Sequence, residues 1–389
     1  MIRNISVGID VGSSMTRVVV GEFLKGEKNP KIIGVGMAPT EGMRHGYVVS
    51  PSLATASIKN ALRLAEKSSE IKIKRAFVAL SGATLQGVMS GGGAIVSKAD
   101  GEVTALDINK ALQDCEENLN NGTSANNKKI IHTYPISFKL DGKEVLGRLE
   151  GLRGTKLETK ALFVTYSVVH LEDLLSVIAE AGVETIDVIA APVALSSLVL
   201  SEKQKIVGVA LVDIGAETTS LSIFENEKLI ALHTFSIGGA EITNDLALGF
   251  KIPLQRAEDL KLGNVSEEFS GKKLEEIIEA RLLDIFESIE NNLKKIKRSE
   301  LLPAGAVFVG GGANIPSLVE LSKSVLKIPS SIGGSEIFGN NKTKLRDPAW
   351  FAALGLLTTE NSAYGENSAR NFFKDLKNTI KSSIKQLMP

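Results

Sequence analysis

The sequence has few of the features that mark specialised classes of protein. It contains a single cysteine, Cys115, which excludes an intramolecular disulfide and fits a reducing compartment. No apolar run approaches the roughly 20 residues that span a bilayer. The strand-like start MIRNISVGIDVG leaves no room for the apolar segment of a signal peptide. We therefore expect a protein that starts in the cytoplasm.

The chain has no excess of positive or negative charge, because 45 Lys and Arg balance 45 Asp and Glu. Binding nucleic-acid phosphates needs a basic face, so no nucleic-acid partner is expected. The four histidines lack HExxH spacing and no cysteine cluster exists, which argues against a zinc site. With 389 residues, 43% of them hydrophobic, the chain should form two domains or one bilobed domain.

Two distant segments repeat one pattern without a shift in spacing. GIDVGSSMTRVVVGEF, from Gly8, and LVDIGAETTSLSIFEN, from Leu211, each read as a strand, Asp-x-Gly, three residues, Thr and a second strand. This pattern predicts β-hairpins and excludes P-loop and Rossmann motifs, which need a helix after the glycines. The alternative is that each Asp-x-Gly is only a tight turn.

The paired hairpins suit a polyphosphate held from both sides. Glycine lets backbone N–H groups approach a phosphate, and serine or threonine hydroxyls add donors. An aspartate at the end of each first strand is placed to hold a hydrated Mg²⁺. The residues concerned are Asp10, Gly12, Ser13 and Ser14 in the first hairpin and Asp213, Gly215, Thr218 and Thr219 in the second.

Further glycines precede predicted helices. AVFVGGGANIPSLVELSKSVL reads as a buried strand, then Gly310, Gly311 and Gly312, then a helix with Pro316 in its first turn. In FSIGGAEITNDLALGF, Gly238 and Gly239 precede a helical pattern. Backbone exposed at such junctions suits a nucleotide's sugar and phosphates.

The segment RAEDLKLG places Glu258 and Lys261 three residues apart on one helical face. Taken alone, this pair is explained by a salt bridge.

The last residues form a basic amphipathic pattern inside a neutral protein. A helix over 370–389 would gather apolar side chains on one face and lysines beside it. This arrangement is typical of an interfacial membrane anchor attracted by anionic lipid; the alternative is a helix docked on the body or on a partner. The residues are Phe372, Phe373, Leu376, Ile380, Ile384 and Leu387 on the apolar face, with Lys374, Lys377 and Lys381 beside it.

Taken together, the two hairpins, the strand-GGG-helix and the AEDLK helix resemble the superfamily of actin, sugar kinases and Hsp70 ATPases. Within it, VALSGATLQGVMSGGGAI, GEVTALDINKAL, IIHTYPISFKLDG and GLRGTKLE are similar to the 1C subdomain of the FtsA cell-division family. LEEIIEARLLDIFESI resembles that family's helix in subdomain 2B. The resemblance covers essentially the whole chain.

The resemblance implies an α/β, actin-like two-lobed ATPase fold with an inserted 1C subdomain and a C-terminal amphipathic helix. The expected parts are 1–74 with 166–205 (1A), 75–165 (1C), 206–236 with 303–360 (2A, its last helix packing back toward 1A), 237–302 (2B), 361–369 (linker) and 370–389 (membrane-targeting helix).

The resemblance also implies a function. Asp10, Gly12, Ser13, Asp213, Gly215 and Thr218 match the two phosphate hairpins, and Gly238, Gly239, Glu258, Lys261 and Gly310 to Gly312 match positions around the nucleotide. ATP and Mg²⁺ are the implied cofactors. Arg281 is implied to receive the C-terminal peptide of FtsZ, and its alternative is a charge paired with a neighbouring acid. Other implied partners are further copies of the chain in a filament, anionic lipid, and division proteins bound by 1C. The implied location is the cytoplasmic face of the membrane at the division site.

Three departures from the FtsA pattern bear on hydrolysis. Met15 replaces a lysine, and Arg17, which points across the strand, is not counted as its substitute. Ala216 and Glu217 replace a Gly-Gly pair, so Glu217 would repel a phosphate or help to hold Mg²⁺; it is the one candidate for a catalytic group. Ser220 replaces an acid that is common in the family. We expect weak ATPase activity at most. The rival hypotheses are a PilM-like pilus-assembly ATPase and a small-molecule kinase, which needs a general base.

Overall fold

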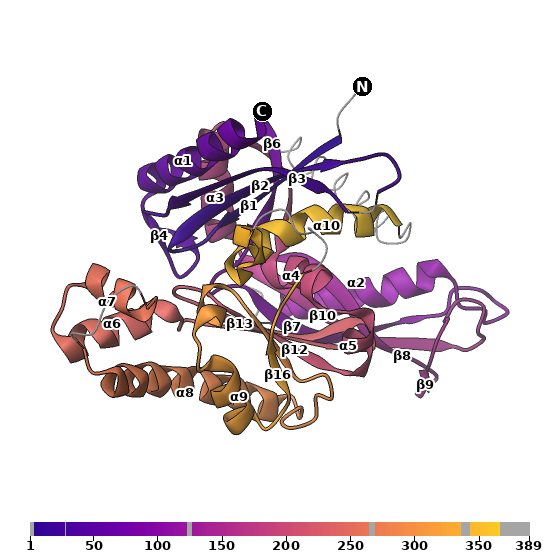
Figure 1. Cartoon of the computed structure of the whole chain (residues 1–389). Helices are drawn as coiled ribbons and strands as arrows, with labels where there is room; N and C mark the ends of the chain where they lie inside the picture. Colours follow the sequence, from indigo (N-terminus) through magenta and orange to yellow (C-terminus); the bar gives the residue numbers. More distant parts are fainter. Residues whose placement is uncertain (1–3, 28, 123–126, 264–268, 336–342, 366–389) are drawn as a thin grey trace.

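The computed structural model describes residues 4–27, 29–122, 127–263, 269–335 and 343–365 (Figure 1). Its frame consists of two five-stranded sheets and one four-stranded sheet, with helices packed against them. The first sheet lies in the upper part of Figure 1, the second lies below it, and the four-stranded sheet extends to the side with α2.

The first sheet has the strand order β11-β6-β1-β2-β3. β1 pairs antiparallel with β2, and β2 pairs antiparallel with β3. On the other side, β6 runs parallel to β1 and β11 runs parallel to β6. The strands are β1 (Asn4–Val11), β2 (Met15–Phe23), β3 (Lys31–Pro39), β6 (Arg75–Leu80) and β11 (Glu184–Ala190).

The second sheet repeats this plan with the order β14-β13-β12-β15-β16. β12, β13 and β14 form an antiparallel meander, and β15 and β16 add parallel strands beyond β12. Each sheet is therefore a three-stranded antiparallel meander that is extended on one side by two parallel strands. The strands are β12 (Val209–Ile214), β13 (Thr219–Glu225), β14 (Lys228–Phe235), β15 (Ala306–Val309) and β16 (Ser330–Ile332).

Helix α1 (Pro51–Ser69) covers β2 and β3 of the first sheet and packs beside α3 (Val168–Glu180). It begins after Ser50 with Pro51 in its first turn, a position that needs no backbone N–H. Its buried residues recur at helical spacing, which turns one face to the sheet. They include Ala54, Ile58, Ala61, Leu62 and Ala65.

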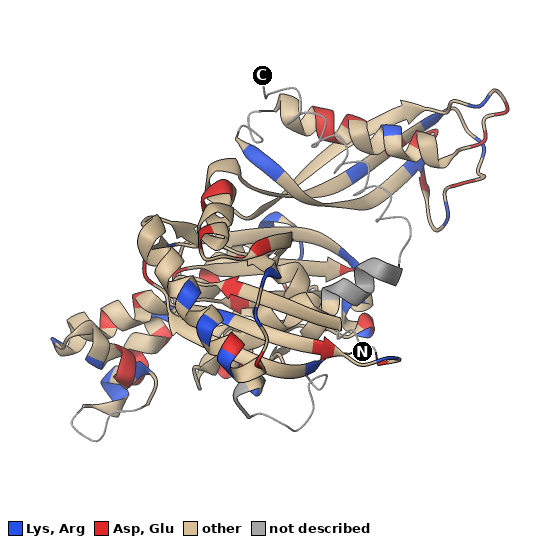
Figure 2. Ribbon diagram, turned by 90° about the horizontal axis from the view of Figure 1, so that it is seen from above, with Lys and Arg blue, Asp and Glu red and all other residues tan. Residues whose placement is uncertain are grey.

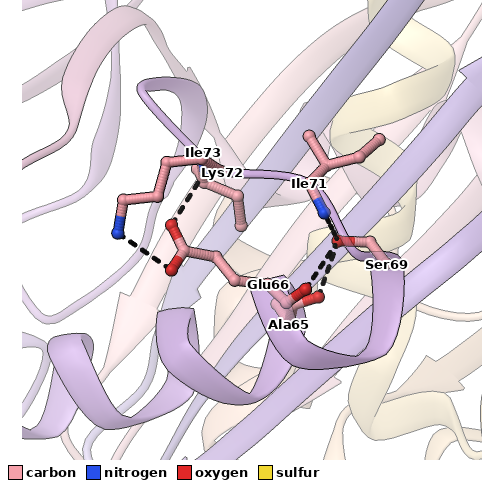
Figure 3. A network of polar contacts seen from close by, with 6 residues as sticks. All are labelled: Ala65, Glu66, Ser69, Ile71, Lys72 and Ile73. Carbon is pink, nitrogen blue, oxygen red and sulfur yellow. Dashed lines mark hydrogen bonds and ion pairs between the residues drawn. The ribbon is translucent and has the colours of Figure 1, made fainter.

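The end of α1 is fixed by side chains that bind backbone groups of its last turn and of the segment that follows it (Figure 3). Ser69 Oγ donates to the carbonyl of Ala65 at 2.8 Å and accepts the N–H of Ile71 at 3.3 Å. Glu66 accepts the N–H of Ile73 at 2.9 Å and pairs with Lys72 at 3.0 Å. These contacts direct the chain from α1 into β6.

Helix α10 (Phe351–Gly365) packs on β1 and on α4 (Ala191–Val199), on the face of the first sheet away from α1 (Figure 1). The approach is close: a Cβ on Gly8 would lie 2.4 Å from the carbonyl oxygen of Ala353, and one on Gly355 would lie 2.3 Å from that of Ala194. This helix follows the second sheet in sequence and packs on the first, so it connects the two.

The four-stranded sheet has the order β7-β10-β8-β9 and is covered by α2 (Ala105–Asn121). Thr104 and Asp107 form a capping box at the start of α2, and hydrogen bonds from Thr104 and Ser97 lower the pKa of Asp107 despite its burial. β14 of the second sheet contacts this sheet. The strands are β7 (Gln86–Ile95), β8 (Lys128–Leu140), β9 (Lys143–Val145) and β10 (Lys156–Ser167).

Four helices flank the second sheet: α6 (Gly239–Phe250), α7 (Leu254–Lys261), α8 (Gly271–Lys295) and α9 (Leu318–Leu326). They share a hydrophobic core with one face of the sheet. The other face contributes Leu211, Phe224 and Val309 to the core that also holds the first sheet and α10. Lys, Arg, Asp and Glu are interspersed over both lobes and the insert (Figure 2).

Some predicted boundaries can be placed on these elements. β6 falls within the range predicted for 1C, but it pairs with β1 and β11 in the first sheet. α10 continues to Gly365, so the beginning of the predicted linker is helical. The tail 370–389, with all its predicted membrane contacts, lies outside the described residues. The division into subdomains stays a prediction.

Candidate functional site

The first hairpin closes between β1 and β2. The N–H of Gly12 donates to the carbonyl of Met15 at 3.2 Å, and Asp10 lies opposite Arg17 in the strand register. Asp10 is 9% exposed at the end of its strand. The second hairpin, β12–β13, closes in the same way: the N–H of Gly215 donates to the carbonyl of Thr218 at 2.8 Å. The hairpins predicted from the repeated pattern are therefore confirmed.

The two aspartates belong to different sheets but interact electrostatically. Burial, with a smaller contribution from the charge of Asp10, raises the pKa of Asp213 to about 7. Burial also raises the pKa of Asp10. The Arg17 guanidinium opposes both shifts. Two carboxyls with poorly solvated charges suit a cation that would replace the missing water.

Arg17 is the residue that the sequence analysis missed. Its cross-strand position opposite Asp10 puts its charge beside both aspartates rather than away from them. The guanidinium lies 5.9 Å from the ring centre of Trp350, and its Nε is buried without a hydrogen-bond partner in the described part of the chain. The antiparallel register alone, which pairs position 10 with position 17, could have identified it.

The GGG segment lies against the second hairpin. Gly310 has φ +82°, and a Cβ there would lie 2.3 Å from Asp213 Oδ1, so only glycine fits this backbone. A Cβ on Gly312 would lie 2.4 Å from Ile214 Cγ2. The predicted helix start is wrong in detail: a 3-10 turn, η2 (Gly311–Asn314), follows the strand, and α9 begins only at Leu318, beyond Pro316.

Gly238 and Gly239 also lie against the second hairpin, at the start of α6. The N–H groups of Gly239 and Ala240 donate to the carbonyls of Gly215 and Ala216 at 2.9 and 2.7 Å. Glu241 accepts the N–H of Gly238 at 2.8 Å. These amides are therefore occupied by the protein, and the glycines serve to bring the helix close to the hairpin.

Glu258 and Lys261 form the salt bridge that the sequence offered as the alternative, at 2.7 Å. The bridge is part of a network: Thr243 donates to Glu258 at 2.5 Å, and Lys261 donates to the carbonyl of Gly239 at 3.1 Å. The pair thus joins α7 to the first turn of α6, next to the second hairpin.

The predicted hydroxyl donors differ in their surroundings. Thr219 is fully buried and donates to the carbonyl of Ile237 at 2.8 Å, so this hydroxyl holds the hairpin rather than a ligand. Ser13 accepts the N–H of Gly46 at 3.1 Å, which leaves its own O–H to donate. Ser14 is exposed and Thr218 is partly exposed in the two turns.

Among the described residues, Glu217 makes its side-chain contact with His45 and none with the two aspartates. Its carboxylate accepts the N–H of His45 at 2.5 Å. From the sequence, Glu217 was expected to repel a phosphate or to help hold Mg²⁺; in the structure its carboxylate has a different partner.

Arg281 lies on α8 and is paired with two acids. It binds Asp245 of α6 at 2.8 Å and Asp284 of its own helix at 3.1 Å. These pairs raise the pKa of Arg281. The structure therefore contains the ion pairing that was the alternative to a peptide contact. Across the described residues, no helix is both long and apolar enough to cross a membrane.

Comparison with solved structures defines the class first. The fold is that of the actin-like proteins: a structure of the PilM-PilN type IV pilus biogenesis complex matches with a TM-score of 0.67 and 17% identity, covering 92% of this chain and 98% of the other. At that identity the match shows the fold alone.

Sequence comparison shows which family the chain resembles. The family model "Cell division protein FtsA" matches residues 210–355. Cell division protein FtsA of Bacillus subtilis is 28% identical over 373 residues, covering 90% of this chain and 82% of the relative. FtsA of Pseudomonas aeruginosa is also 28% identical, covering 90% and 88%. The resemblance to FtsA is thereby confirmed, at 28% identity over 90% of the chain, and it accompanies an actin-like fold.

Proposed function

We propose that this chain is an ATP-binding cell-division protein that forms actin-like filaments and holds FtsZ filaments at the cytoplasmic face of the membrane. The observation that carries the nucleotide part is the pair of hairpins of identical register, whose terminal aspartates interact although they belong to different sheets. The similarity to FtsA over 90% of the chain supports the role in division.

In this proposal the nucleotide lies between the two hairpin turns. Backbone and hydroxyl donors around Gly12, Ser13, Ser14, Gly215 and Thr218 bind its phosphates, and Arg17 supplies a positive charge. Asp10 and Asp213 hold Mg²⁺ through water, and the metal neutralises phosphate charge. Gly310 to Gly312, Gly238, Gly239 and the Glu258–Lys261 network form the wall on the side of the second lobe. With Glu217 bound to His45, no general base is assigned, which agrees with weak hydrolysis at most.

The partner contacts are proposals of the same kind. Arg281 contacts the FtsZ peptide by exchanging part of its pairing with Asp245 and Asp284 for an acidic group of the peptide. The 1C insert contacts other copies and other division proteins, and the basic tail 370–389 binds anionic lipid.

Co-sedimentation tests the adaptor role. Full-length chain, FtsZ filaments and vesicles containing anionic lipid should pellet together with MgATP. Phe372→Asp with Phe373→Asp should release the chain from vesicles but leave FtsZ binding intact. Arg281→Gln should weaken FtsZ binding, whereas Arg298→Gln, which removes another ion-paired arginine of the second lobe, should not. Failure of the wild-type chain to bring FtsZ to vesicles would contradict the proposal.

The PilM-like alternative is kept because the solved PilM-PilN structure shares the fold at a TM-score of 0.67. It predicts binding to a short peptide of a pilus-assembly partner and no dependence of function on the tail. Rapid phosphoryl transfer to a sugar or acid would instead support the kinase alternative.

A further inference from the structure

The turn between β4 (Met43–Arg44) and β5 (Tyr47–Val48) lies between the two hairpins. His45 and Gly46 both have positive φ, 47° and 82°. A Cβ on Gly46 would lie 2.3 Å from Gly82 Cα. The backbone is therefore held in a conformation that glycine permits, pressed against the segment that follows β6.

This turn binds the second hairpin through two contacts with one residue. The N–H of His45 donates to the Glu217 carboxylate at 2.5 Å, and the His45 ring Nδ1 lies 3.1 Å from the Glu217 carbonyl oxygen. A carbonyl oxygen can only accept, so Nδ1 is the donor in this contact. The residues are 172 positions apart in sequence, and they join the first lobe to the second.

The same turn binds the first hairpin and the insert. The N–H of Gly46 donates to Ser13 Oγ at 3.1 Å. The hydroxyl of Tyr166, at the end of β10, lies 3.1 Å from the carbonyl oxygen of Gly46. The carbonyl of His45 accepts the N–H of Ala83 at 2.9 Å. One two-residue turn therefore contacts both hairpins, the segment that follows β6 and the strand β10.

We propose that Glu217 is a positioning residue that latches the second hairpin to the His45–Gly46 turn and so limits how far the two lobes can separate. A hydrogen bond to an ionised acceptor is stronger than a neutral one, and Glu217 supplies the charged member of this contact. The latch also draws the carboxylate to a protein donor, away from phosphates that it would repel.

Amide hydrogen exchange on the full chain without nucleotide tests the latch directly. We expect Glu217→Ala to speed exchange of the His45 amide about tenfold, because its charged acceptor is lost. Glu217→Gln, which keeps a neutral acceptor, should give a smaller increase. Glu227→Gln, at the exposed far end of β13–β14, is the matched control and should leave His45 unchanged.

A second readout rests on the proposed nucleotide binding: a fluorescent ATP analogue should dissociate several-fold faster from Glu217→Ala than from wild type or Glu227→Gln. The two readouts are separable. If the analogue does not bind wild type, the proposed function is contradicted, whereas the exchange of the His45 amide still tests the latch. Unchanged His45 exchange in both Glu217 variants, or equal acceleration in Glu227→Gln, would overturn the latch. If the alanine variant does not fold, Glu217→Gln carries the test.

Discussion

The first hairpin, β1–β2, and the second, β12–β13, close with the same Gly N–H to carbonyl contact but surround it with different charges. Asp10 lies across from a cation, Arg17, whereas Asp213 lies across from Ser220. The first turn carries Ser13 and Ser14 where the second carries Ala216 and Glu217. The two hairpins thus share one backbone conformation. The first lobe supplies the cation, Arg17, and the second supplies the carboxylate of the latch, Glu217.

The two aspartates also differ in the charges that act on them. Asp213 has no cation on its own hairpin and depends on Arg17 from the first sheet, while burial and Asp10 disfavour its ionised form. The site is therefore completed only when both lobes contribute. Substitutions that act on one hairpin at a time can test this division of roles.

The largest loss of stability should come from Gly310→Ala, which crowds the second hairpin only. The added Cβ would lie 2.3 Å from Asp213 Oδ1 on a backbone of positive φ. We therefore expect the free energy of unfolding to fall by about 3 kcal/mol, and nucleotide binding to weaken as well. Gly311→Ala meets no atom within 4 Å and is the control. Urea unfolding of both variants measures the difference; equal effects would contradict the close packing.

Asp213→Asn should change how stability depends on pH, measured without Mg²⁺. In the folded protein Asp213 keeps its proton to about pH 7, whereas its ordinary value is 3.8. Its contribution to stability is therefore complete below about pH 4 and is lost as the pH rises through about 7. Above pH 7, Asp213→Asn should be more stable than wild type by about 2–4 kcal/mol.

Asp10→Asn sharpens the same comparison. It removes a charge that raises the pKa of Asp213, so the fall in stability between pH 4 and 7 should be smaller than in wild type without vanishing. Thermal unfolding measured between pH 4 and 7 compares the stability of Asp10→Asn with that of wild type. Parallel pH profiles for wild type and Asp213→Asn would show that Asp213 ionises normally.

Arg17→Gln should weaken MgATP binding about tenfold, because it removes the charge that the first hairpin offers to both halves of the site. Arg75→Gln, an exposed arginine at the start of β6 in the same sheet, should bind normally. Equilibrium titration distinguishes them. Equal affinity in both variants would mean that Arg17 serves only the aspartates and not the ligand.

The smallest effect should come from Ser13→Ala, which removes the first hairpin's contact with Gly46. A neutral hydrogen bond contributes about 1 kcal/mol, so the change in stability should be of that size and smaller than the effect of Glu217→Ala. Chemical denaturation of the two variants compares them directly. A larger loss for Ser13→Ala would reverse the proposed roles of the two hairpins.

Much of this arrangement follows from the sequence. The repeated Asp-x-Gly pattern predicted both hairpins, because strand patterns and turn glycines are local signals. The role of Arg17 was misjudged because its pairing with Asp10 across the hairpin was overlooked; its effect on Asp213 also depends on where the second sheet lies. The contact of Glu217 with His45 joins segments 172 residues apart, and no local pattern contains it. The occupied amides of Gly239 and Ala240 were hidden for the same reason.

The central claim is that the two hairpins together hold one nucleotide, and calorimetric titration of MgATP into the full chain tests it most directly. Wild type should bind one ATP per chain, and Asp10→Asn and Asp213→Asn should each weaken binding strongly, because neither hairpin suffices alone. Binding that is absent in wild type, or unchanged when both aspartates are replaced, would contradict the account.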